Sequence, residues 1–424
     1  MSVRLYSTLS RRPEELPEPP GPVRMYICGP TVNARAHIGN ARPFVIGMWL
    51  RAWLRLRGYD AIFVHNITDI NDKIYDAAPG ASAALAEQVT KWYIEDTGAF
   101  GLGMPDHMPK ASEMVPQIVR FIEELIEGGY AYAVDGDVYF RVARDPEYGR
   151  LSGQRPDQVE EQEPNPLKED PRDFALWKAN KPSEDTWWDS PWGRGRPGWH
   201  IECSVMAEEL LGTEFEIHGG GLDLVFPHHE NELAQSSALG HEFARIWMHN
   251  GILSFTDEKM SKSLGNVVTT DQALEDWGRE TLLVYFLTGH WRKPIDFSQE
   301  TLEAAAARAD RFREVFRNTS EPAPEGAWER FAAALDDDFN TPDALAVMHE
   351  WRDHDLLLRA LDVFGLASLA ESEEAPAELV ALAEQRQEAR ARGDFAAADR
   401  LREEIGSNGW EVRDVADGFR LVRK

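Results

Sequence analysis

Two cysteines, a histidine and a glutamate of this chain are of the types that bind a metal ion. Cys28 ends the apolar run MYIC, just before Gly-Pro, and Cys203 lies in the stretch GWHIECS. His228 and Glu232 stand four residues apart directly after a proline, so on a helix their side chains share one face. If the fold brings the first strand beside this helix, the four side chains complete a zinc site. The alternative is two buried structural cysteines and an ordinary surface helix.

Two further motifs suit the binding of phosphate groups. His37-Ile38-Gly39-Asn40 falls where a helix is expected to begin, and a helix N-terminus is an anion site. The polar stretch DEKMSKSLGN carries Lys259 and Lys262, and a lysine on a loop can follow charge that develops during a reaction. Taken singly, each motif is better explained by an exposed capping turn or a solvated loop.

Composition limits the class of protein. A chain of 424 residues with 43% hydrophobic content is long enough for about two to four domains. It has no long apolar run and no apolar leader, and we expect a soluble, cytoplasmic protein. The cysteine count excludes a disulfide framework. The net charge of -28 argues by itself against a nucleic-acid partner, although basic residues gather near the chain's end.

The elements that must position these residues follow from hydrophobic periodicity. Residues 25–57 predict a strand, a turn and a helix, and the run AIFVH after them predicts a second buried strand, which together make a βαβ unit. Ligands of such sheets bind at the carboxyl ends of the strands. Residues 82–129 are expected to be mostly helical. The run HEFARIWMHNGILSF predicts a later strand.

Composition changes along the chain indicate its domains. Residues 129–191 begin with a predicted hairpin and continue as a proline- and acid-rich stretch, which predicts an insertion between two halves of one sheet. After Thr270 the pattern is helical, and an acidic linker near residues 371–378 precedes two helices and a strand-turn-strand with a basic tail. We predict an α/β fold: a Rossmann-like parallel-sheet domain split by an insertion, then a helical bundle and a small C-terminal domain. The predicted ranges are 1–128, 129–191, 192–258, 259–325, 326–372 and 373–424.

The motifs together resemble a known family. HIGN followed by KMSKS resembles the two signatures of class I aminoacyl-tRNA synthetases, and the stretches CGPTV, NITDINDK, RPGWHIECS, LVFPHHENE and DDDFNTPDAL resemble cysteinyl-tRNA synthetases over essentially the whole chain. The resemblance implies ATP-dependent activation of L-cysteine to cysteinyl-adenylate and its transfer to tRNA(Cys). It also implies one Zn²⁺ per chain, held by Cys28, Cys203, His228 and Glu232. A zinc ion that binds thiolate separates cysteine from serine, which an ordinary pocket separates by only about 1–3 kcal/mol.

The resemblance assigns roles to further residues. It implies catalytic roles for His37, Asn40, Lys259 and Lys262. It implies that ATP, with Mg²⁺, is bound by Pro30, His37, Gly39, Asn40 and Lys262. Cysteine would be bound by Gly29, Thr68 and Trp199. His218, His229 and Gly219 to Gly221 are expected to shape the pocket.

The same resemblance extends to the domains and partners of the chain. Residues 259–325 are expected to contact the tRNA stem and residues 373–424 the anticodon, and we expect a monomer with no membrane partner. Relatives often have Tyr-Asp where this chain has Asn33-Ala34.

One alternative within the same structural family is the ligase that joins cysteine to glucosaminyl-inositol in mycothiol synthesis. That enzyme lacks a counterpart of Glu232 and ends near the helical domain, whereas this chain has both Glu232 and a further segment after the linker. A second alternative is a synthetase-like protein that has lost catalysis; the presence of His37, Lys262 and all four presumed ligands argues against it.

Overall fold

The structure is a computed structural model that describes residues 2–154, 163–255, 258–259, 268–371, 375–415 and 418–423. The chain divides into two compact units, residues 1–369 and residues 370–424. Each unit has its own core and is described by itself. Within the described residues, no helix is both long and apolar enough to span a membrane.

A parallel sheet stands at the centre of the first unit. Its strands are β3 (Pro22–Ile27), β4 (Asp60–His65), β9 (Glu214–Gly221) and β10 (Phe243–Asn250), in the order β10-β9-β3-β4. All neighbours pair in parallel. From the central strand β3 the chain moves to β4 at one edge of the sheet. From the other central strand, β9, it later moves to β10 at the opposite edge. The order therefore reverses between β3 and β9, which is where such sheets bind their ligands.

Helices and small strands cover this sheet. α1 (Ile38–Leu56) connects β3 to β4, with Trp49 and Trp53 fully buried. α5 (Trp199–Leu211) precedes β9, and α6 (Glu230–Ala238) leads into β10. The remaining elements of this part are β1 (Arg4–Ser7), β2 (Arg12–Glu15), α2 (Asp72–Ala77), α3 (Ser82–Gly98) and α4 (Val115–Glu127).

The insertion forms an antiparallel sheet of its own. Its strands are β5 (Ala131–Val134), β6 (Asp137–Phe140), β7 (Phe174–Ala179) and β8 (Gly195–Pro197), paired in that order. This sheet extends beyond the predicted range 129–191, because Trp177 of β7 pairs with Pro197 of β8. The α/β architecture with an inserted segment was predicted from the sequence, and the structure confirms it.

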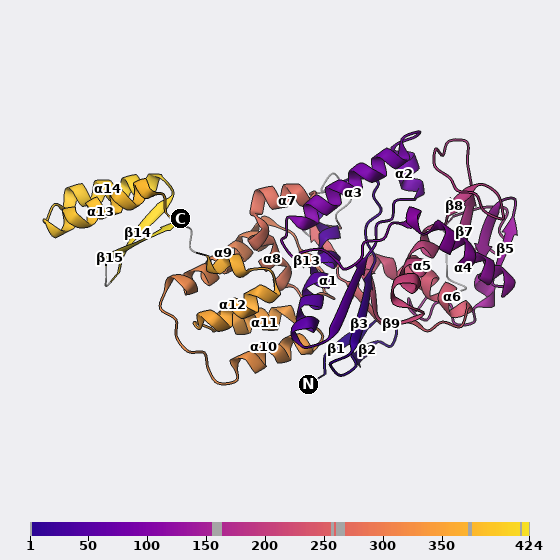
Figure 1. Cartoon of the computed structure of the whole chain (residues 1–424), viewed down its shortest axis with the longest axis horizontal. Helices are drawn as coiled ribbons and strands as arrows, with labels where there is room; N and C mark the ends of the chain where they lie inside the picture. Colours follow the sequence, from indigo (N-terminus) through magenta and orange to yellow (C-terminus); the bar gives the residue numbers. More distant parts are fainter. Residues whose placement is uncertain are drawn as a thin grey trace. The chain divides into compact units, whose positions relative to one another are not determined.

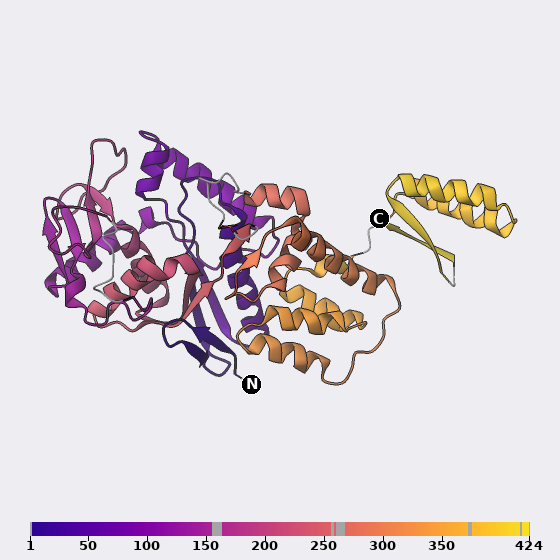
Figure 2. The ribbon, with the colours of Figure 1, turned by 180° about the vertical axis from the view of Figure 1, so that it is seen from behind.

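Helices fill the other side of the first unit. After β11 (Leu253–Phe255) and β12 (Glu258–Lys259) come α7 (Thr270–Trp277), α8 (Arg279–Thr288), β13 (Ile295–Asp296), α9 (Gln299–Arg317), α10 (Ala327–Asp336), α11 (Thr341–His349) and α12 (His354–Val363). Trp53 of α1 donates a hydrogen bond to Asp336 of α10 at 3.2 Å, which joins the bundle to the sheet domain. In both views, α8 to α12 lie on one side of the parallel sheet and the antiparallel sheet lies on the other (Figure 1, Figure 2).

The second unit is small. It contains α13 (Ala377–Ala391), α14 (Phe395–Ser407), β14 (Trp410–Val415) and β15 (Gly418–Arg423), with the two strands antiparallel. Its core is built from Leu379, Ala383, Ile405, Trp410 and Val412. The two helices and the strand-turn-strand agree with the sequence prediction.

Candidate active site

The four predicted metal ligands meet at the carboxyl edge of the parallel sheet. Cys28 directly follows β3, and its N–H donates to the carbonyl of Gly219 at 2.8 Å, which fixes it beside β9. Cys203 comes from α5. One ligand atom from each of Cys28, Cys203, His228 and Glu232 lies within 4.8 Å of all the others, and all four residues are buried. Ligand atoms around a tetrahedral zinc ion stand about 3.3–3.8 Å apart, so a small contraction would close this group on a cation.

A distorted turn presents the histidine and the glutamate. The sequence predicts a helix that starts near Pro227, but the chain is extended at Phe226 and forms a π-turn over Val225–His229 before α6 begins at Glu230. His228 and Glu232 still share a face, with 3.0 Å between Nε2 and Oε1. The predicted spacing therefore holds across the irregular turn.

Further histidines surround this group. His218 Nε2 lies 2.9 Å from Glu232 Oε2, and His229 Nε2 lies 3.3 Å from Cys28 Sγ, so these two histidines with Cys28 and Glu232 form a second, overlapping set of possible ligands. His249 contacts His229 through ring nitrogens 2.8 Å apart. His218 and His229 were expected to shape the pocket, and their ring nitrogens lie against the presumed ligand atoms of Glu232 and Cys28.

The protonation of the buried group suits a cation. Burial raises the pKa of Glu232, but the imidazoles of His218 and His228 outweigh burial and lower that pKa to about 2. Burial likewise lowers the pKa of His228, yet the charges of Glu232 and Cys203 raise it to about 10. Burial pushes the pKa of Cys203 up, whereas a hydrogen bond from Cys28 brings it to about 6. A divalent cation that displaced the His228 proton would bind the nitrogen lone pair and replace the positive charge of that proton.

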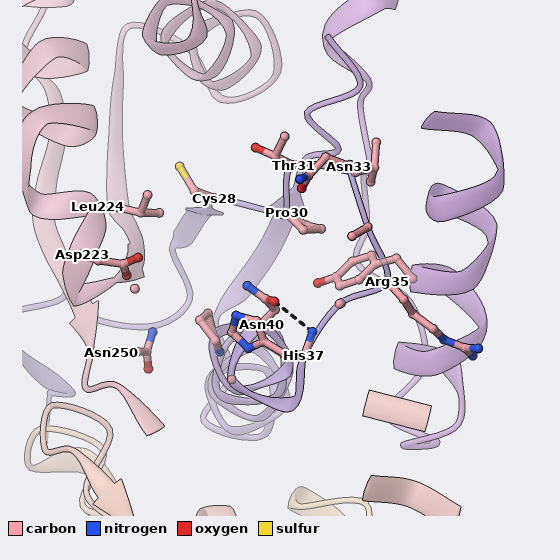
Figure 3. A pocket seen from close by; sticks show the side chains of 18 of the residues that line it. Cys28, Pro30, Thr31, Asn33, Arg35, His37, Asn40, Asp223, Leu224 and Asn250 are labelled. Carbon is pink, nitrogen blue, oxygen red and sulfur yellow. Dashed lines mark hydrogen bonds between the residues drawn. The ribbon is translucent and has the colours of Figure 1, made fainter. Parts of the chain in front are cut away.

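A cavity of about 480 Å³ opens above Cys28. Figure 3 shows Cys28 and Pro30 on one part of its wall and His37 and Asn40 on another. The sequence-predicted residues that line it are Cys28, Gly29, Pro30, His37, Gly39, Asn40, Trp199 and Gly221. The Trp199 indole stacks on the His228 imidazole with 4.3 Å between ring centroids, so the metal group and the HIGN motif border the same space.

Close backbone approaches explain two glycines of this wall. A Cβ at Gly29 would collide with the carbonyl oxygen of Asn66, so only glycine lets the end of β3 lie against the loop after β4. A Cβ at Gly39 would stand 2.9 Å from the imidazole of His37. Glycine at this position therefore leaves room for the His37 ring over the first turn of α1.

The HIGN motif forms the beginning of α1. His37 is the N-cap, and its N–H donates to Oδ1 of Asn40 at 3.2 Å. Asn40 thereby holds the turn and keeps its side-chain amide at the helix N-terminus. The α1 dipole makes this end of the cavity attractive to anions.

Thr68, Lys259 and Lys262 are the predicted residues that remain. Thr68 is not among the cavity-lining residues that the structure describes: its N–H donates to the Pro30 carbonyl at 3.1 Å and its hydroxyl accepts from Asn66 at 3.2 Å, so it supports the wall from behind. Lys259 is the last residue of β12, paired with Ser254. Lys262 and the rest of the KMSKS motif lie outside the described residues.

Sequence reasoning missed several residues of the site. Asp223 and Asn250 line the cavity after β9 and at the end of β10, and Lys73 lies on its rim with Nζ 5.7 Å from the centroid of the Trp199 ring. His200 contacts His228 through Nδ1 atoms 3.0 Å apart. For Asp223 and Asn250 the available signal was position, because residues at the carboxyl ends of parallel strands converge.

Comparison with known proteins decides the family. Residues 16–307 match the catalytic domain of class I tRNA synthetases (C), and residues 330–354 match the DALR domain. The Cysteine–tRNA ligase of Brevibacillus brevis is 42% identical over 469 aligned positions that cover 100% of both chains. The chain belongs to the cysteine–tRNA ligase family. The family member of Halorhodospira halophila is 43% identical over 457 positions, covering 99% of each chain.

Solved structures support the same fold. Methionyl-tRNA synthetase of Mycobacterium tuberculosis, in complex with methionyl-adenylate, superimposes with a TM-score of 0.60 over 82% of this chain and 88% of that one. The sequence identity is 15%, so this likeness concerns the fold alone. A cysteine–tRNA ligase family member thus shares the class I synthetase fold, as the sequence motifs predicted.

Proposed function

We propose that the protein activates L-cysteine with ATP to cysteinyl-adenylate and transfers the cysteine to tRNA(Cys). The observation that carries this proposal is that the Cys28, Cys203, His228 and Glu232 group and the start of α1 border one cavity. An amino acid whose thiolate is held at the group has its carboxylate free to face the HIGN end. Cysteine is the amino acid that suits such a site, and the relatives that match this chain over its whole length carry the name Cysteine–tRNA ligase.

The proposed metal is zinc, one ion per chain. The donor set is two thiols, an imidazole and a carboxylate, a mixture that zinc accepts and that magnesium or calcium does not. When bound, zinc supplies a soft Lewis acid that takes up a substrate thiolate more readily than a hydroxyl. Cys28, Cys203, His228 and Glu232 would hold it. Trp199, stacked on His228, would form one wall of the side-chain pocket, and Gly29 another.

The chain's own residues supply binding and orientation for the ATP. His37 and Asn40 lie at the N-terminus of α1, where the helix dipole favours the phosphates, with Pro30 and Gly39 beside them. Attack by the cysteine carboxylate on the α-phosphate needs little proton transfer, so positioning and charge stabilisation carry the rate. We propose that Lys262, assisted by Lys259, stabilises the departing pyrophosphate, with Mg²⁺ accompanying the ATP.

The transfer step concerns tRNA. The DALR-domain match at residues 330–354 and the separate unit of residues 370–424 support a tRNA-binding role for the C-terminal part. We assign the anticodon to residues 373–424 and the tRNA stem to residues 259–325. We also propose that the protein is a monomer and acts in the cytoplasm.

The decisive experiment is exchange of labelled pyrophosphate into ATP by the purified protein, with cysteine, serine or no amino acid. The proposal expects exchange with cysteine, little with serine, and about one zinc per chain. Transfer is then tested with tRNA(Cys) and with glucosaminyl-inositol as acceptors. Exchange that does not depend on cysteine would contradict the proposed activation, and transfer to glucosaminyl-inositol alone would replace the proposed acceptor.

A further inference from the structure

Arg35 connects three segments around the cavity. It lies in the loop between Cys28 and α1, and its Nε and one terminal nitrogen donate to the Asp96 carboxylate of α3 at 3.1 and 2.6 Å. Its other terminal nitrogen lies 2.8 Å from Oδ2 of Asp271, in the first turn of α7. One guanidinium therefore holds the loop, α3 and α7 together.

The backbone repeats the connection between the loop and α7. The N–H of Ile38 donates to the carbonyl of Val268 at 3.0 Å, and the N–H of Thr270 donates to the carbonyl of Ala36 at 3.0 Å. His37 thus runs beside the residues that lead into α7, with which it forms an antiparallel bridge at Thr269. The place of His37 is consequently set by the elements that Arg35 joins.

The contacts of Arg35 require an arginine. The planar guanidinium donates to both oxygens of the Asp96 carboxylate and also reaches the Asp271 carboxylate. The single ammonium group of a lysine cannot make all these contacts. Asp96 is only 4% exposed, so its charge needs a fixed partner. The guanidinium also lies 5.5 Å from the centroid of the Trp92 ring of α3.

Arg35 is one of the residues that line the cavity, but its side chain extends away from the HIGN motif and the metal group (Figure 3). In Figure 3, Arg35 points away from His37, Asn40 and Cys28. The Asp271 side chain is 40% exposed, so the ion pair with it adds little stability by itself. The arrangement is therefore better suited to fixing geometry than to supplying free energy of folding.

We propose that Arg35 is a positioning residue for the use of ATP, because it fixes the N-terminal end of α1 against the start of α7. The inference rests on the proposed function and adds a residue to it. Loss of the clamp lets the loop carrying His37 shift relative to α7, and a shift of about 1 Å in a reacting geometry costs up to about 100-fold in rate. The metal group lies beyond this loop and keeps its own contacts.

The test compares Arg35→Gln with a matched control, Arg24→Gln. Arg24 also makes a bidentate contact to a carboxylate, with nitrogens 3.0 and 2.9 Å from Glu216, but at the start of β3, far along the strand from the cavity. Cysteine-dependent pyrophosphate exchange is measured at varied ATP and varied cysteine, together with zinc content and melting temperature. We expect Arg35→Gln to lose at least about tenfold in kcat/KM for ATP, with the KM for cysteine and the zinc content unchanged.

The other variants separate positioning from general structure. Asp271→Asn should reproduce part of the ATP defect, and Arg35→Lys should restore little of it, because lysine holds one carboxylate at most. Arg24→Gln should lower the melting temperature to a similar extent and leave the kinetics for ATP unchanged. The inference is overturned if both arginine variants have equal ATP kinetics, or if Arg35→Gln changes cysteine and ATP kinetics alike. Absence of cysteine-dependent exchange in the unaltered protein would instead contradict the proposed function.

Discussion

Replacing Cys203 by serine tests the proposed metal centre most directly. Cys203 is 1% exposed and shares the cluster with Cys28, His228 and Glu232. Serine is nearly the same size, and its hydroxyl keeps a hydrogen-bonding group there. The variant should therefore fold, with a cost of about 1–3 kcal/mol in the free energy of unfolding for a poorly matched buried hydroxyl.

The expected effect on the metal is much larger. A hydroxyl is a poor zinc ligand at neutral pH, whereas, against the effect of burial, the hydrogen bond with Cys28 lowers the pKa of the Cys203 thiol and so favours its thiolate. Loss of a residue that hydrogen-bonds a metal ligand typically weakens metal affinity by about 10- to 100-fold, and loss of a ligand itself should exceed that. Without the metal, discrimination between cysteine and serine should fall to what shape alone provides, roughly 10- to 200-fold.

The measurement is zinc content by elemental analysis, followed by pyrophosphate exchange with each amino acid. Ser204→Ala is the control, since Ser204 is the next residue of α5, is fully buried and donates to Gln235 at 2.5 Å. Ser204→Ala leaves the buried carbonyl oxygen of Gln235 without this donor, which costs about 1–3 kcal/mol and should leave the zinc in place. A Cys203→Ser protein that retains full zinc and full preference for cysteine would refute the assigned ligand set.

The remaining predictions concern the nucleotide and the tRNA. Gly39→Ala places a methyl group 2.9 Å from the His37 ring and should lower exchange at least about tenfold with zinc content unchanged; normal exchange would show that the ring position is unimportant. Lys262→Ala should slow adenylate formation in single-turnover measurements far more than it weakens cysteine binding, and equal losses would indicate a structural lysine. A chain ending at Glu371 lacks the second unit and should retain exchange while charging tRNA poorly; unchanged charging would remove the tRNA role from residues 373–424.

Local pattern predicted most of the elements, because each depends on residues close in sequence. The strand before Cys28, the helix after His37 and the hairpin of the insertion all follow from periodicity and turn residues. The end of the insertion was missed because β8 is short and is identified only by its pairing with β7. Strand order, which places β3 beside β9, depends on pairing between distant segments that periodicity does not encode.

Some residues of the site could be predicted from the sequence, and others are revealed only by the fold. Cys28, Cys203, His228 and Glu232 were found because their types match a ligand set and the family resemblance links them. His200 and His249 have no such spacing, and a single histidine in an apolar run gives no signal until the fold places it against another ring. Thr68 was assigned to the cysteine pocket by resemblance; the structure shows its hydroxyl accepting a hydrogen bond from Asn66, and its contact with cysteine stays a prediction.

The pairing of β3 with β9 has a consequence for biosynthesis. Cys28 emerges from the ribosome early, but its companions in the cluster follow only after the whole insertion has been made. A chain translated only as far as the insertion therefore carries Cys28 alone of the four proposed ligands. Zinc binding at the proposed site would therefore coincide with the pairing of the two halves of the sheet.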